Sequence, residues 1–235
     1  MRKFWPGITG LLIISAMSLA LVPPGHGAEF QTWSDITTIY RFADGWRYDG
    51  DQGVRGVLSD SDFTLLYFRP SVRYQVRPWF TVHGGVRFFK TFNDDEDDTF
   101  EIGPWQGLRY AWPKLSGYAV THYLRLEERM TWETEGDSDF DFTVRARYQL
   151  GARSPNYDIL FDNGIYLVGS IEPFADLEKP LFINRIRYVV GAGTKVSDAW
   201  QVELNYLWQQ GRSSASSSFG LDDHALRLRL FYTFD

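Results

Sequence analysis

Arginines recur at alternate positions in several segments of this chain. The clearest examples are Arg145 with Arg147, and Arg227 with Arg229. Side chains two residues apart lie on the same face of a β-strand, so each pair places two guanidinium groups side by side. Arginines without a carboxylate partner need water or an anion, and rings of arginine select anions in pores. The spacing therefore indicates either anion binding or passage, or arginines that fill a narrow interior by bonding to polar side chains.

Catalysis has little support among the titratable residues. An acyl-ester site needs a histidine beside a nucleophile. His122 falls on the apolar face of its segment, His224 begins a segment, and no serine is aimed at His83. Glu127 and Glu128 are adjacent and so lie on opposite faces. We predict no enzyme, catalytic residue, cofactor or metal site, with a lipid-acyl-modifying outer-membrane enzyme as a minor alternative.

The last segment, Leu226–Phe234, shows how the arginines are arranged. Its residues alternate with a period of two, which is typical of a strand that separates two environments. Arg227 and Arg229 occupy one face. The opposite face is apolar and ends in two aromatic residues: Leu226, Leu228, Leu230, Tyr232 and Phe234.

The same alternation recurs in other segments and predicts a charged interior. An arginine or lysine at the middle of a bilayer costs about 2–4 kcal/mol, so the charged faces must point into a barrel. By parity, twelve arginines and four carboxylates, among them Glu101 and Asp141, lie inside. The predicted lumen-lining residues are Arg69, Arg73, Arg87, Arg109, Arg125, Glu127, Arg129, Arg145, Arg147, Arg185, Arg187, Glu203, Arg227 and Arg229.

We therefore expect an all-β fold, an antiparallel transmembrane β-barrel. Eleven segments have strand character, and none has a sustained helical period. Bacterial single-chain barrels have even strand numbers, so we predict 12 strands, with 10 as the alternative and Tyr157–Asp162 as the missed strand. Short turns alternate with longer polar loops, as expected for periplasmic and outer ends. The eleven segments are Gln31–Phe42, Trp46–Val57, Phe63–Val76, Trp79–Phe92, Phe100–Trp112, Tyr118–Trp132, Phe140–Leu150, Gly164–Glu172, Leu181–Gly193, Trp200–Gln209 and His224–Phe234.

Residues 1–27 have the form of a secretory signal peptide. Arg2 and Lys3 precede an uncharged apolar stretch, Ile8–Val22, and small residues follow it. We predict cleavage near Ala28 and a single barrel domain over residues 28–235 in the outer membrane of a Gram-negative bacterium. The chain has no cysteine, which excludes disulfides and thiolate metal sites. Aromatic residues make up 17% of it, as two aromatic girdles require.

Two interpretations of the interior arginines are open. They fill a closed barrel with a structural or envelope-maintenance role, or they line a porin-like channel for small anionic solutes. The acidic runs Asp94–Asp98 and Glu135–Asp137 are interpreted as solvated loops, with a divalent-cation bridge to lipopolysaccharide as the alternative. We expect a monomeric barrel whose partners are outer-membrane lipid, lipopolysaccharide, small anionic solutes and, through the C-terminal strand, the barrel-insertion machinery. No nucleic-acid partner is expected.

Four short motifs carry a family resemblance: Arg125–Arg129 (RLEER), Arg145–Tyr148 (RARY), Asn184–Tyr188 (NRIRY) and Leu226–Leu230 (LRLRL). With them the chain resembles the bacterial family known as domain of unknown function 2490. The resemblance covers most of residues 28–235 and implies an outer-membrane barrel, with no established substrate, catalytic residue or cofactor. Barrels of this kind commonly end on an aromatic residue, whereas here Asp235 comes last.

Overall fold

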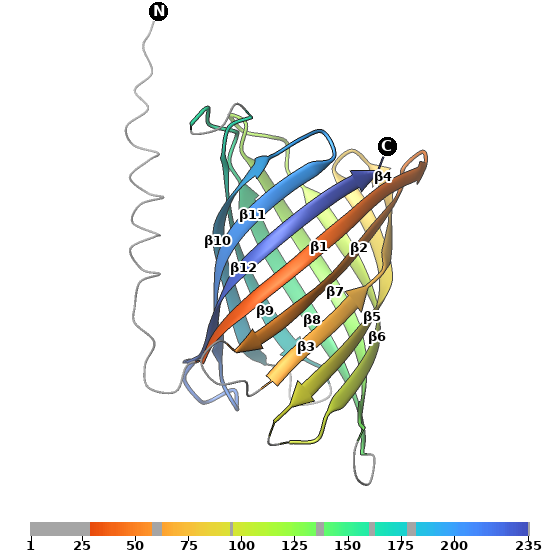
Figure 1. The fold of residues 1–235 in the computed structure, drawn as a ribbon, viewed down its shortest axis with the longest axis vertical. Coiled ribbons are helices and arrows are strands. Elements are labelled where there is room, and N and C mark those ends of the chain that lie inside the picture. The colour runs from red at the N-terminus through yellow and green to blue at the C-terminus, as the bar shows by residue number, and fades with distance from the viewer. Residues whose placement is uncertain are drawn as a thin grey trace, which may run out of the picture.

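The computed structural model describes residues 29–57, 63–94, 96–134, 139–159, 163–177 and 182–234, and every regular element among them is a β-strand (Figure 1). No helix in these ranges is long and apolar enough to cross a membrane. The predicted signal peptide, the cleavage site near Ala28, the run Glu135–Asp137 and Asp235 lie outside the described residues. The strands are β1 (Glu29–Ala43), β2 (Trp46–Val57), β3 (Phe63–Arg69), β4 (Ser71–Arg77), β5 (Phe80–Asn93), β6 (Thr99–Ala111), β7 (Ala119–Glu133), β8 (Phe140–Arg153), β9 (Tyr166–Asp176), β10 (Ile183–Lys195), β11 (Trp200–Gly211) and β12 (Gly220–Phe234).

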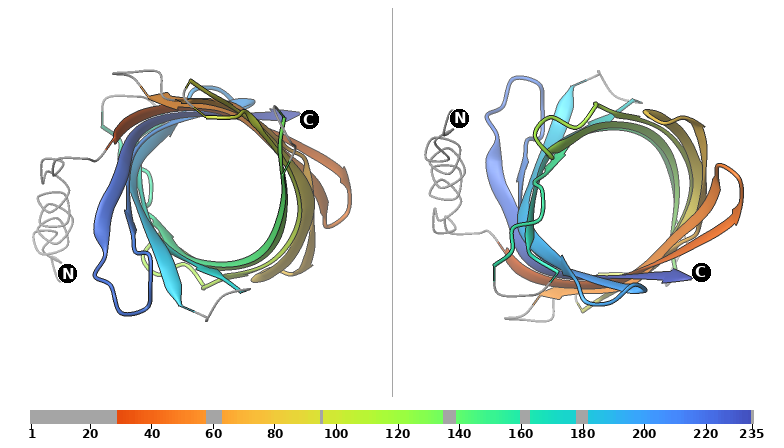
Figure 2. Two further views of the ribbon diagram at one scale, coloured as in Figure 1. Left: turned by 90° about the horizontal axis from the view of Figure 1, so that it is seen from below. Right: turned by 90° about the horizontal axis from the view of Figure 1, so that it is seen from above.

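The strands form one closed sheet, and Figure 2 shows its round wall along the barrel axis. Eleven strands make the ring in the order β1, β12, β11, β10, β9, β8, β7, β6, β5, β3, β2, with β2 returning to β1. The twelfth strand, β4, stands outside this order and pairs with β2 and β5 beyond the end of β3. Pro70 separates β3 from β4, and its missing N–H interrupts the hydrogen-bond ladder.

The prediction of an antiparallel barrel with 12 or 10 strands is therefore wrong in two respects. The ring has eleven strands, and it is mixed, because β1 and β12 pair in parallel from Glu29 opposite Asp223 to Tyr40 opposite Phe234. A chain that reverses at each connection brings its first and last strands into the same direction when the strand number is odd. The proposed extra strand, Tyr157–Asp162, contributes only an isolated bridge between Tyr157 and Ile165, and residues 160–162 lie outside the described ranges.

The two ends of the barrel differ in their connections. The end that carries the C-terminus (Figure 1) carries tight turns, such as Asp44–Gly45 between β1 and β2, together with one longer connection, 154–165 between β8 and β9. Gly45 has a φ of 74°, which glycine adopts without strain. We call this end the short-turn end. The opposite end carries the start of β1 and the connections 94–98, 134–139, 177–182 and 212–219, and we call it the long-loop end.

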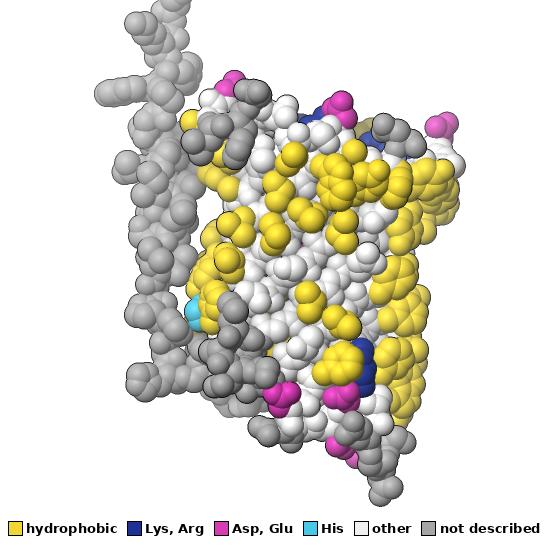
Figure 3. All heavy atoms as spheres, in the orientation of Figure 1, with side chains coloured by type: hydrophobic (Ala, Val, Ile, Leu, Met, Phe, Trp, Pro, Cys, Tyr) yellow, Lys and Arg dark blue, Asp and Glu magenta, His cyan; other side chains and the backbone are white. Residues whose placement is uncertain are grey.

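The outer wall is apolar. Even-numbered residues on most strands point outward, and large side chains such as Leu108, Leu124 and Leu204 are 45–52% exposed. Hydrophobic side chains cover much of the visible wall in Figure 3, whereas acidic side chains lie at the two ends. The alternation seen in the sequence thus separates an apolar outside from a polar inside.

Aromatic rings form two belts on this wall. At the short-turn end, each ring contacts the next in the series Trp79, Tyr110, Trp112, His122 and Tyr148. At the long-loop end, the corresponding series contains Tyr188, Trp208, Tyr206, His224 and Phe30, and a second group contains Phe100, Trp132 and Phe140. On β6, Phe100 and Tyr110 belong to opposite belts and are ten residues apart. At about 3.3 Å per residue and a tilt of about 40°, the belts are about 25 Å apart.

Candidate functional site: an arginine-lined cavity

A cavity of about 590 Å³ lies inside the barrel. It reaches the short-turn end, because its wall includes Ala119 at the start of β7, Arg153 at the end of β8 and Gln201 near the start of β11. Its carboxylates are Glu172 and Glu203, and no lysine lines it. Nine arginines from seven strands line it: Arg55, Arg69, Arg109, Arg125, Arg147, Arg153, Arg187, Arg227 and Arg229.

Some of these arginines are held by buried carboxylates. The side chain of Asp35 on β1 has no exposed surface, and its oxygens lie 2.5 Å from Arg227 Nε and 3.3 Å from Arg229 Nε. Glu203 on β11 accepts a hydrogen bond from the Tyr166 hydroxyl at 2.9 Å and lies 3.5 Å from Arg229 Nη1. These contacts fix the two arginines of β12 by bonds to β1 and β11, the strands on either side.

Three of the cavity arginines have no ion pair with a carboxylate among the described residues: Arg55, Arg109 and Arg153. The guanidinium carbon of Arg55 lies 4.0 Å from the centre of the Trp33 ring, and that of Arg153 lies 3.6 Å from the centre of the Tyr166 ring. Stacking on an aromatic face orients a guanidinium group without neutralising it. These three charges therefore remain available to an anion in the cavity.

At the inner end of the cavity, four arginines converge on a single carboxylate. The two Glu127 oxygens lie 2.5 Å from Arg87 Nη1, 2.7 Å from Arg125 Nε, 2.5 Å from Arg145 Nη2 and 2.9 Å from Arg147 Nη1. Glu127 is 1% exposed. Four guanidinium groups therefore lie within hydrogen-bond distance of this one carboxylate.

Further contacts extend this cluster into a closed ring of side chains inside the barrel. Arg147 binds Glu172 at 2.7 Å, and Glu172 lies 3.7 Å from Arg187. Arg187 and Arg55 both stack on Trp33.

The ring returns to Glu127 on the other side of the lumen. Arg55 stacks on Tyr67, and Tyr67 meets Phe89 edge-on with ring centres 5.8 Å apart. The guanidinium carbon of Arg87 lies 5.6 Å from the centre of the Phe89 ring. Arg87 also binds Glu101 at 2.8 Å. We call the ring the septum: Trp33, Arg55, Tyr67, Arg87, Phe89, Glu127, Arg147, Glu172 and Arg187.

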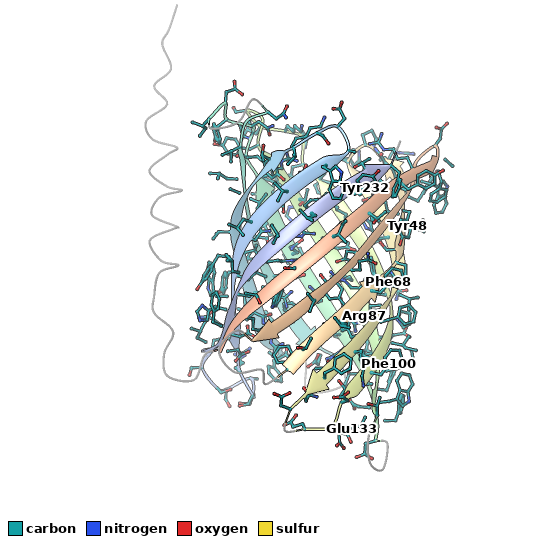
Figure 4. The ribbon with its side chains drawn as sticks, in the orientation of Figure 1. Tyr48, Phe68, Arg87, Phe100, Glu133 and Tyr232 are labelled. Atoms are coloured by element: carbon teal, nitrogen blue, oxygen red, sulfur yellow. The ribbon has the colours of Figure 1, made fainter. Side chains whose placement is uncertain are left out.

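The septum is closely packed. Six of its nine residues are buried: Trp33, Tyr67, Arg87, Glu127, Arg147 and Glu172. Figure 4 shows Tyr232 and Tyr48 toward the short-turn end, Phe100 and Glu133 toward the long-loop end, and Arg87 between them. The septum therefore lies between the two aromatic belts, and it shares Arg55, Arg147, Glu172 and Arg187 with the cavity wall.

The structure distributes the fourteen predicted lumen residues over four places. Arg87 and Glu127 belong to the septum, and two further arginines lie beside it: Arg145 binds Glu127, and Arg129 binds Glu101 at 2.6 Å. Arg73 lies on β4 and contacts Asp49 at 3.3 Å, away from the cavity wall. Arg185 lies at the long-loop end, with its side chain 47% exposed and 3.5 Å from Asp222. Eight of the fourteen line the cavity: Arg69, Arg109, Arg125, Arg147, Arg187, Glu203, Arg227 and Arg229.

Sequence reasoning missed part of the interior. Asp35, Asp49, Asp51 and Glu172 also form ion pairs with interior arginines, so the ratio of twelve arginines to four carboxylates overstated the imbalance. Asp141 is exposed near the start of β8, so the prediction that it lies inside is wrong. Two cavity arginines, Arg55 and Arg153, were missed as well, although Arg55 shares its parity with Asp51 on β2.

The three histidines among the described residues form hydrogen bonds with residues other than serine. His83 contacts the Thr81 hydroxyl at 3.1 Å, His122 lies between Trp112 and Tyr148, and His224 contacts the Tyr206 hydroxyl. Within the described part of the chain, no three His, Asp or Glu side chains form a group that could hold a metal ion.

The fold and the site together define a class: a closed β-barrel with an apolar outer wall and a charged interior. The sequence model of a family described as a protein of unknown function, DUF2490, matches residues 30–219. The chain belongs to this family, which confirms the resemblance seen in its motifs. Among curated proteins, none matches the chain.

Proposed function

We propose that this protein is an outer-membrane β-barrel of a Gram-negative bacterium whose cavity takes in small anionic solutes. The wall supports a membrane location, because its two aromatic belts are about 25 Å apart, the height of the apolar band in outer-membrane barrels. The short-turn end, with the C-terminus, then faces the periplasm, and the long-loop end contacts lipopolysaccharide. The apolar C-terminal strand is the segment that the insertion machinery would recognise.

The observation that carries the proposed solute class is the charge of the cavity wall, with nine arginines and two carboxylates. Arginine presents a rigid, permanently charged fork that binds carboxylate or phosphate through two parallel hydrogen bonds. Inside a barrel these interactions are screened less than at an open surface. A cation would meet more positive than negative side chains on this wall.

Removing two unpaired arginines tests this function. Replacing Arg109 and Arg153 by Gln leaves no carboxylate without its partner, so the fold should be retained. We expect the Kd for pyrophosphate, measured by isothermal titration calorimetry in detergent, to rise at least about tenfold, because each tenfold step corresponds to only about 1.4 kcal/mol.

The matched control is the double variant Arg77→Gln with Arg185→Gln, which removes two arginines outside the cavity. Its Kd should stay close to that of the unmodified protein. The proposal fails if the unmodified protein binds no pyrophosphate, or if both double variants lose affinity equally.

A closed barrel with a structural or envelope-maintenance role is the second candidate. The septum favours it, because its buried guanidinium, carboxylate and aromatic groups pack against one another inside the barrel. Under this proposal the arginines act as filling, and the cavity variants bind pyrophosphate as weakly as the unmodified protein does.

A further inference from the structure

We infer that the cavity is a dead-end binding site for a multivalent anion, closed at its floor by the septum and reached from the short-turn end. This inference rests on the proposed function and deepens it, since it makes the barrel a one-sided receptor instead of an open channel. The residue that keeps the floor closed is Glu127.

The shape of the cavity supports a single opening. Its wall reaches the ends of β7 and β8 at the short-turn end, through Ala119 and Arg153. In the other direction it ends on Arg147, Glu172 and Arg187, which line the cavity and also belong to the septum. An anion that enters from the short-turn end therefore meets a packed layer of side chains.

The placement of the charges points to a ligand with several anionic groups. The nine arginines come from seven strands and face one another around about 590 Å³, far more space than one phosphate group needs. A monovalent anion can bind only neighbouring guanidinium groups. A compact polyphosphorylated or polycarboxylated molecule can bind arginines on opposite walls at once, such as Arg109 of β6 and Arg227 of β12.

Glu127 closes the floor by neutralising charges that otherwise repel one another. Arg87, Arg125, Arg145 and Arg147 come from three strands and meet only because one carboxylate lies among them. Like charges within a few ångströms repel strongly where the local dielectric is low. Without the carboxylate, these arginines should separate and draw water into the septum.

The ligand and the septum compete for the same side chains. Arg125 and Arg147 line the cavity and also bind Glu127 at 2.7 and 2.9 Å. A multivalent anion in the cavity offers these arginines an alternative partner and should loosen the septum when it binds.

Conductance in planar lipid bilayers tests this inference. The unmodified protein should stay closed. The Glu127→Gln variant should show an anion-selective conductance at least tenfold larger than that of the unmodified protein. Trp33→Ala removes a neutral member of the septum and should also conduct, which keeps the test valid if Glu127→Gln does not fold. The matched control is Asp49→Asn, which neutralises an interior carboxylate that binds Arg47 and Arg73 outside both the septum and the cavity wall, and this variant should stay closed.

Tripolyphosphate and orthophosphate probe the ligand class. Tripolyphosphate should block the Glu127→Gln current from one chamber only, at a concentration at least tenfold lower than orthophosphate. Equal block by the two anions, or equal block from both chambers, would contradict a one-sided site for a multivalent anion.

The possible failures are distinguishable. A large steady anion current through the unmodified protein overturns the septum but leaves an anion-accepting barrel intact. Closed Glu127→Gln and Trp33→Ala barrels that still bind tripolyphosphate also overturn the septum as the closing element. Absence of tripolyphosphate binding by the unmodified protein, together with cation-selective current in the variants, overturns the proposed function itself.

Discussion

Asp35 shows how one buried carboxylate can fix two strands. Its side chain has no exposed surface and contacts Arg227 and Arg229 across the pairing of β1 with β12. A buried ion pair adds little compared with apolar packing, but removing one partner leaves a buried charge without compensation. Asp35 should therefore matter more for stability than an exposed ion pair does.

Replacing Asp35 by Asn should lower the free energy of unfolding by about 3–5 kcal/mol. The shape of the side chain is retained, so the loss reports the two uncompensated arginines. Urea unfolding of the protein folded in lipid vesicles, followed by tryptophan fluorescence, measures it. Asp198→Asn is the control, since Asp198 is fully exposed and contacts Lys195 on the surface. A midpoint shift in the control equal to that of Asp35→Asn would contradict this account.

At the residue scale, the sequence predicts which side of the wall most arginines occupy, but not their partners. Parity is a local property, so the interior position of Arg227 or Arg229 follows from the apolar residues beside it. The partner of Arg227 is Asp35, 192 positions away, in a segment whose alternation is weak. The contact between Arg87 of β5 and Glu127 of β7 reaches across the intervening strand β6, so it depends on the register and tilt of the whole sheet.

At the scale of elements, the closing pairing of β1 with β12 is the feature that sets the topology. Eleven segments were recognisable from their alternation, and they correspond to the eleven positions around the barrel, with Phe63–Val76 divided at Pro70. The step from eleven to 12 came from the even strand number of most bacterial barrels. Closure is a property of the complete sheet, and no single segment encodes whether the number of strands in the ring is odd or even.

A pair of introduced cysteines tests the direction of the closing pairing. Thr38 lies opposite Tyr232 in the parallel register, and the chain contains no other cysteine. Thr38→Cys with Tyr232→Cys should form a disulfide on mild oxidation, because opposed strand residues have Cα atoms within the 4.4–6.8 Å range that disulfides need. The cross-link joins the first and last strands and changes the migration of the denatured chain on a non-reducing gel.

Thr38→Cys with Leu226→Cys is the matched control. Leu226 lies six residues from Tyr232 along β12, about 20 Å away, so this pair should not react. An antiparallel closure would be indicated by a cross-link in the control pair and none in the test pair.

At the scale of the whole molecule, positive side chains gather inside the barrel and many acidic side chains lie at its ends. The chain has a formal net charge of −6, yet its cavity is lined by nine arginines and two carboxylates. Acidic residues lie at the ends of the barrel, as Figure 3 shows for the visible face. The outer wall carries apolar side chains between two aromatic belts. This arrangement is the reverse of a water-soluble barrel with an apolar core.

The most direct test of this arrangement compares spin labels on the two faces of the wall. Leu204 is 52% exposed on the outer wall, and Gln149 lines the cavity. In lipid vesicles, a label at Leu204→Cys should relax with oxygen, which concentrates in hydrocarbon, and be shielded from a water-soluble nickel chelate. A label at Gln149→Cys should show the opposite preference. A label at Leu204→Cys that the nickel chelate reaches as freely as it reaches Gln149→Cys would contradict a barrel with its apolar face in lipid and its arginines inside.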